Sequence, residues 1–115
     1  MKGYWLVKNN IDKIIEISFP DADMFLINSL MSTLNYSQIV ELRDKLLEVN
    51  LNTKPFVIEY EYGSLDIGPV NIVVHFTMFE QESECCLYTE VYRNAMVEYV
   101  EEYDKMMEES NGLSK

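Results

Sequence analysis

The chain has few histidines and cysteines, the residues on which zinc sites and thiol-based catalysis depend. Its 115 residues include one histidine and two cysteines, and the cysteines, Cys85 and Cys86, are neighbours. Adjacent cysteines lack the spacing of a zinc site, and a disulfide between neighbours needs a strained peptide. We therefore expect two reduced, mostly buried thiols and no bound metal. The four glycines lie at turns or ends and form no phosphate-binding loop, so the sequence predicts no cofactor.

Long apolar runs and basic residues are also scarce. No apolar run approaches the roughly 18 residues that a membrane span requires, and the N-terminus lacks a signal-peptide pattern. Nine Lys and Arg residues face 20 Asp and Glu residues, which gives a net charge of −11. This charge repels phosphate backbones, so we expect no direct binding of nucleic acid. The sequence predicts a soluble, cytoplasmic protein without membrane attachment, in agreement with reduced thiols.

Apolar residues recur along most of the chain and predict a β-hairpin near the N-terminus. Residues 4–7 and 11–19 are rich in strand formers, and they flank Asn9 and Asn10, which tolerate the backbone of a tight turn. Turns of two or three residues both fit. Alternation places one set of apolar residues of the second strand on a common face: Ile11, Ile15, Ile17 and Phe19.

Two short helices are predicted to follow. The first runs through Leu34 and is capped by Asp21 or Asp23; the second begins after a cap at Ser37 and runs through Glu48. The second helix carries an apolar stripe of Ile39, Leu42, Leu46 and Val49. Two helices that cover one face of a sheet fit this pattern better than a DNA-reading pair, because acidic residues surround the few bases.

A second hairpin is predicted on either side of the segment GSLDIGP, which we interpret as a turn. Alternating apolar residues in the two flanking segments fall on one face when Tyr62 lies opposite Val70. The pairs predicted by this register are Phe56–Phe76, Ile58–Val74, Tyr60–Ile72 and Tyr62–Val70.

The C-terminal third is predicted to form one long amphipathic helix from about Thr89 to Glu109. Its apolar stripe has spacings of three and four and consists of Tyr92, Met96, Tyr99, Tyr103 and Met106. Residues 84–89 fit either a strand or the first helical turn, and residues 110–115 are predicted to be a frayed tail. The chain is thus expected to be a single α+β domain over residues 1–115, in the order ββ-αα-ββ-(β)-α, with its helices packed on an antiparallel sheet.

Acidic residues are concentrated in this last third. Residues 80–115 carry ten acids and three bases, whereas residues 1–79 carry ten acids and six bases. A surface of this sign attracts basic partners and accelerates their association at low salt. We predict a partner-binding set of nine carboxylates: Glu82, Glu84, Glu90, Glu98, Glu101, Glu102, Asp104, Glu108 and Glu109. The alternative is that they only keep the protein soluble.

Three functions follow from these observations. The first is a non-enzymatic inhibitor whose acidic face occupies a basic, nucleic-acid-binding enzyme. In size and charge, though not in any motif, the chain is similar to phage anti-defence or anti-CRISPR proteins and to toxin-immunity proteins. The second is a homo-oligomer, a homodimer for example, that assembles through the stripe of the last helix. The third, which we rank last, is a small enzyme that uses His75 with Glu59 or Glu61.

Overall fold

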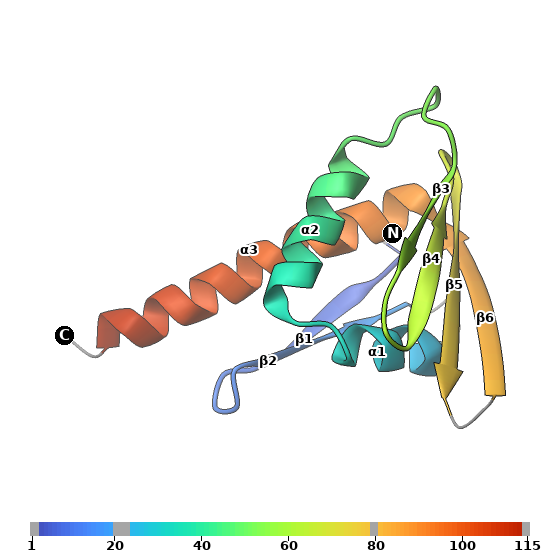
Figure 1. Cartoon of the computed structure of the whole chain (residues 1–115). Coiled ribbons are helices and arrows are strands. Elements are labelled where there is room, and N and C mark those ends of the chain that lie inside the picture. Colours follow the sequence, from blue (N-terminus) through green and yellow to red (C-terminus); the bar gives the residue numbers. More distant parts are fainter. Residues whose placement is uncertain (1–2, 20–23, 79–80, 114–115) are drawn as a thin grey trace.

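The computed structural model describes residues 3–19, 24–78 and 81–113, and it confirms the α+β class (Figure 1). Six strands and three helices occur among these residues. In chain order they are β1 (Trp5–Asn9), β2 (Ile14–Ser18), α1 (Met24–Ser32), α2 (Tyr36–Leu47), β3 (Phe56–Glu59), β4 (Gly63–Ile67), β5 (Asn71–Met78), β6 (Gln81–Tyr88) and α3 (Thr89–Leu113).

The strands divide between two antiparallel sheets. β1 and β2 form a two-stranded sheet, and the other four strands form a meander in the order β3-β4-β5-β6. The helices and the β1–β2 hairpin all lie on one side of the four-stranded sheet, which leaves its other face open (Figure 1). The outward residues Val57, Glu59 and Asp66 are accordingly exposed.

The predicted register of the second hairpin is wrong, because the segment interpreted as a turn contains the strand β4. Leu65 pairs with both Ile58 and Val74, so β4 separates the two strands that were expected to be neighbours. The apolar alternation continues through Leu65 and Ile67, both fully buried, and only Asp66 between them is exposed. The predicted inner face is nevertheless correct for most positions, since Ile72, Val74 and Phe76 are buried.

The N-terminal hairpin forms as predicted, but its turn lies further along the chain. Asn10 to Lys13 connect the strands, and the Asn9 side chain accepts hydrogen bonds from the backbone N–H groups of Ile11 and Asp12. Lys13 takes a positive φ of 56°. Ile11 is therefore at the tip and 92% exposed, contrary to its predicted inward position. The inward positions of Ile15, Ile17 and Phe19 are confirmed.

The two short helices also form, with different ends. α1 ends at Ser32, before the predicted Leu34, and the predicted caps Asp21 and Asp23 lie outside the described residues. α2 is capped by Asn35 instead of Ser37, because Asn35 and Gln38 form a reciprocal capping box. The predicted stripe of α2 is confirmed, and all four of its residues are buried: Ile39, Leu42, Leu46 and Val49.

The junction between β6 and α3 shows that residues 84–88 are strand and that the helix begins at Thr89. Thr89 is fully buried; its N–H donates to the carbonyl of Val70 and its hydroxyl donates to that of Gly68. These two bonds fix the start of α3 against the turn between β4 and β5. The helix continues to Leu113, and its C-terminal half extends away from the four-stranded sheet (Figure 1).

The apolar stripe of α3 is used inside the chain. Tyr92, Met96 and Met106 are buried, and Tyr99 packs against the same core. α1 and α3 pack against β5 and β6, and α2 packs on α3. These residues of the stripe therefore pack within the chain, and Tyr103, the remaining member, is half-buried.

Candidate binding surface

The predicted carboxylates of α3 lie on three sides of the helix. With α-helical geometry of 100° per residue, Glu90, Glu101 and Glu108 share the outward side, opposite the buried stripe. Glu98 and Glu102 lie on the flank that faces β1, whereas Asp104 lies on the flank that faces α2. The structure therefore does not bring all nine predicted residues into one array. It separates those that hold neighbouring elements from those that face solvent.

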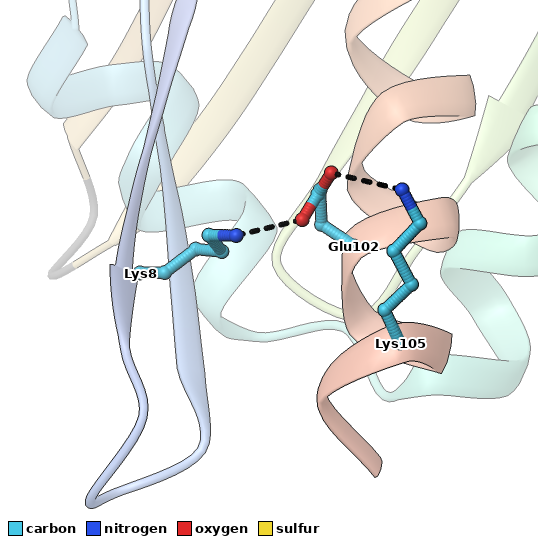
Figure 2. A network of polar contacts seen from close by, with 3 residues as sticks. All are labelled: Lys8, Glu102 and Lys105. Atoms are coloured by element: carbon cyan, nitrogen blue, oxygen red, sulfur yellow. Dashed lines mark hydrogen bonds and ion pairs between the residues drawn. The ribbon is translucent and has the colours of Figure 1, made fainter. Parts of the chain in front are cut away.

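The flank toward β1 is bound to the N-terminal hairpin. Lys8 Nζ lies 2.7 Å from Glu102 Oε2, and Lys105 Nζ lies 3.6 Å from the other carboxylate oxygen (Figure 2). The hydrogen bond from Lys8 lowers the pKa of Glu102, which keeps this carboxylate ionised. Next to this network, the Tyr4 hydroxyl donates to Glu98. Burial, with this hydrogen bond as the next cause, raises the pKa of Tyr4 to about 12.

The flank toward α2 is held by aromatic side chains. Tyr36, in the first turn of α2, donates its hydroxyl to Asp104, and this bond raises the pKa of Tyr36 to about 12. The ring of Tyr36 stacks on that of Tyr103, with centroids 4.3 Å apart, and Tyr103 in turn stacks on Tyr99. Asp104 thus has a partner within the fold, although its side chain is exposed.

The outward side of α3 is different, because its carboxylates have no basic partner among the described residues. None of the ion pairs in the described ranges involves Glu90, Glu101 or Glu108, and all three side chains are exposed. The two described bases of this helix point elsewhere. Arg93 donates to the carbonyls of Leu46 and Val49, and Lys105 is drawn toward Glu102. We call Glu90, Glu101 and Glu108 the outer stripe.

Two of the nine predicted residues have side chains outside the described part of the chain. Glu109 lies in α3, and Glu82 lies in β6 opposite Thr77. Glu84, also in β6, is exposed on the open face of the four-stranded sheet. It is therefore part of a separate acidic surface and not a continuation of the outer stripe.

This second surface surrounds His75. The imidazole Nε2 lies 2.9 Å from Asp66 Oδ2, and Nδ1 lies 3.4 Å from Glu84 Oε2. A neighbouring hollow of about 590 Å³ is lined by Glu59, Glu61 and His75, among others. The predicted partners Glu59 and Glu61 are thus replaced by Asp66 and Glu84. The sequence interpretation missed Asp66 because its strand was assigned to a turn.

A carboxylate faces each ring nitrogen of His75. Ser64 lies directly opposite His75 in the sheet, but the ring nitrogens make their polar contacts with the two carboxylates. This arrangement suits a charged surface that bridges three strands.

The two cysteines lie on opposite faces of β6. Cys85 packs partly against the core, and Cys86 is exposed, so the prediction that both are mostly buried is wrong for Cys86. Both are free thiols. Over the described ranges, no group of three or more His, Cys, Asp or Glu residues is placed to hold a metal ion. No helix in those ranges is long and apolar enough to cross a membrane.

Comparison with known proteins identifies no relatives. No protein-family model, curated protein or solved structure matches the chain.

Proposed function

We propose that this protein binds a basic, nucleic-acid-handling protein in a stoichiometric complex, and that it inhibits this partner by occupying its nucleic-acid-binding surface with α3. The observation that carries the proposal is the outer stripe. Its three carboxylates are exposed, lie on one side of a projecting helix and have no basic partner in the described part of the chain. Such groups are accessible to an external partner.

The charge density of α3 supports the same proposal. Six acids, Glu98 to Glu109, occupy twelve residues of the helix, which is about 18 Å at 1.5 Å per residue. This is one carboxylate for each ~3 Å of axis, close to the 3.4 Å per phosphate along one DNA strand. Counted over all its sides, the helix therefore has a linear density of acids similar to the charge density of a nucleic-acid strand.

The outer stripe and the flanks have different expected roles. Glu98, Glu102 and Asp104 add to the negative potential, but they also hold Tyr4, Lys8 and Tyr36. Reversing their charge would therefore disturb the fold as well as the binding. Reversal of the outer stripe removes charge alone. Charge pairs that become desolvated at an interface are worth about 1.5–7 kcal/mol, whereas pairs at the rim contribute little.

The test compares two variants with the same change in net charge. The first, Glu90→Lys/Glu101→Lys/Glu108→Lys, reverses the outer stripe; the second, Glu59→Lys/Glu61→Lys/Glu84→Lys, reverses the open sheet face. Each variant has a net charge of −5 in place of −11. Tagged wild type and both variants are used to capture proteins from a lysate of the natural host. The captured protein is then purified, and its release of labelled DNA or RNA is titrated with the chain.

The proposal predicts that wild type and the sheet-face variant retain the same basic protein and displace its nucleic acid at a 1:1 ratio. The outer-stripe variant loses this activity while it melts within a few degrees of wild type. Displacement should also weaken steeply between 50 and 200 mM salt. Loss of capture by the sheet-face variant alone would move the site to His75 and its neighbours. Capture that neither variant affects, or no displacement of nucleic acid, would refute the proposal.

A further inference from the structure

The outward face of the β1–β2 hairpin exposes large apolar side chains. Trp5, Val7 and Ile14 are each about half exposed, at 50%, 51% and 50%. The register places Asn9 opposite Ile14 and Val7 opposite Glu16, so these three apolar residues share one face of the two-stranded sheet. Ile11 at the tip, 92% exposed, adds to the same end of the molecule. We call these four residues the hairpin patch.

Within the described ranges, the fold leaves the hairpin patch at least half exposed. The inner face of the hairpin packs on the core through Ile17 and Leu6, and Ile15 on the same face is buried. The outer face carries the only tryptophan of the chain, a residue type enriched in the energetic centres of interfaces. Together the four residues expose roughly 500 Å², within the roughly 300–600 Å² of the largest patch on a typical monomer.

The charge around the patch identifies the partner that fits it. Glu16 is the only ionisable residue of β1 and β2 on this face, and Lys8, on the other face, is neutralised by Glu102. A basic protein gains little electrostatic attraction here. Two copies of a chain with a net charge of −11 repel each other wherever their acidic surfaces meet, and this face is apolar and nearly uncharged. A second copy can thus approach this surface at a low electrostatic cost.

We propose that the hairpin patch is a self-association surface, and that two copies pack their β1–β2 hairpins face to face about a twofold axis. A symmetric dimer uses the same patch on both copies, so each residue of the patch contributes buried surface twice, once from each copy. The two patches together remove about 1,000 Å² of surface, the lower limit for a specific interface. The dimer is accordingly expected to be weak, with a dissociation constant in the micromolar range, and to leave the outer stripe of α3 free.

The dimer and the complex with a basic partner respond to salt in opposite directions. Repulsion between the copies is screened over a Debye length of about 10 Å at 0.1 M and about 3 Å at 1 M salt. Salt also favours apolar burial when a kosmotropic anion such as sulfate is used. Dimerisation should therefore strengthen as sodium sulfate increases, whereas binding to a basic partner should weaken. The two proposals can consequently fail independently.

The test is sedimentation velocity from 1 to 500 μM chain at low and high sodium sulfate, together with the emission of Trp5. Trp5 is the only tryptophan, so its emission reports on this face alone. Wild type should form dimers at the higher concentrations, and its emission should shift to shorter wavelength in parallel. The variant Trp5→Thr/Val7→Thr/Ile14→Thr keeps strand-forming residues and should raise the dissociation constant at least 30-fold.

A matched variant controls for the general loss of exposed apolar surface. Val57, Val70 and Tyr88 are 56%, 53% and 64% exposed elsewhere on the molecule, and their replacement by Thr should leave the dimer intact. Wild type that remains monomeric at every concentration and salt would overturn the proposal. A dimer that forms without any change in the Trp5 emission would also overturn it, and this result does not depend on the folding of a variant. A dimer that only the control variant disrupts would overturn it as well.

Discussion

Replacing Arg93 by methionine should lower the free energy of unfolding by about 2–3 kcal/mol, because Arg93 joins α3 to the C-terminal end of α2. Its Nε donates to the carbonyl of Leu46 at 2.9 Å and its Nη2 donates to that of Val49 at 2.8 Å. The last carbonyls of a helix lack partners within the helix and carry its negative end. Leu46 lies in the last turn of α2 and Val49 lies two residues beyond its end, so Arg93 places a positive charge at the negative end of this helix.

The magnitude follows from these two bonds. A hydrogen bond with a charged donor contributes about 1.5–3 kcal/mol, and the lower end applies here because water can replace part of the interaction at a half-buried site. Methionine retains the apolar stem and its packing, so the loss is confined to the guanidinium. Lysine restores the charge but has no planar pair of donors for both carbonyls, so Arg93→Lys should recover only about half of the loss.

Urea denaturation followed by circular dichroism measures this loss. With a slope of about 1.5 kcal/mol per molar urea, the midpoint of Arg93→Met should fall by roughly 1.5 M at unchanged slope. Lys105→Met is the matched control, since it removes an exposed base from the same helix and should stay within about 0.5 kcal/mol of wild type. A loss below about 0.5 kcal/mol for Arg93→Met, or equal losses for the two variants, would refute a structural role for Arg93.

Three further predictions concern stability. Gly63→Ala should destabilise the fold by more than about 3 kcal/mol in the same assay, because a Cβ at Gly63 would lie 2.2 Å from the carbonyl oxygen of His75. The free energy of unfolding should also fall as the pH rises from 10 to 12. The pKa of Tyr36 is raised to about 12 in the folded chain, so its hydroxyl stays neutral there but ionises near pH 10 when the chain is unfolded. In pH-dependent melting, Tyr36→Phe should reduce this loss of stability. Finally, Tyr92→Phe should change the unfolding free energy by less than about 1 kcal/mol, because the Tyr92 hydroxyl donates to a weak acceptor, Met31 Sδ. Tyr92→Ala should instead cost about 3–5 kcal/mol.

The buried faces could be predicted from the sequence, but the order of the strands could not. Alternation with a period of two fixes which side chains point inward, and this information survives when a strand is inserted with the same parity. Leu65 and Ile67 continue the inward pattern of their neighbours, so a wrong pairing still gave the correct face for Ile72 and Val74. The short segment between Gly63 and Gly68 resembles a turn by composition, and only packing against both neighbours shows it to be a strand.

The predicted positions of the α2 cap and of the hairpin turn were wrong for a related reason. Asn35 and Ser37 are both good capping residues, and the choice depends on whether the residue three positions later can return the hydrogen bond. Gln38 does so for Asn35, and this places the start of α2 at Tyr36. In the hairpin, the Asn9 side chain bonds the turn backbone and moves the turn toward Lys13. Such local competition between side chains is not resolved by periodicity.

The negative charge of the candidate surface could be predicted from the sequence, but its division into outer and flanking carboxylates could not. The acidic residues of α3 are evident from the sequence, and the helical period places Glu90, Glu101 and Glu108 on one side. The partners that occupy the flanking carboxylates come from positions far along the chain: Tyr4 and Lys8 for Glu98 and Glu102, and Tyr36 for Asp104, 68 to 94 residues away. Only the tertiary fold can reveal which carboxylates are already engaged.

This division bears on how the acidic charge should be interpreted. The acids on both flanks of α3 form bonds that tie the helix to β1 and α2, so the fold itself accounts for them. The outer stripe forms no described ion pair, and its like charges repel the other acids of the chain, which opposes the compact state. Solubility alone would be served by carboxylates at any exposed position. Their alignment on the outward side of a projecting helix, while the nearby bases are turned to other partners, is the observation from which we propose an external basic partner.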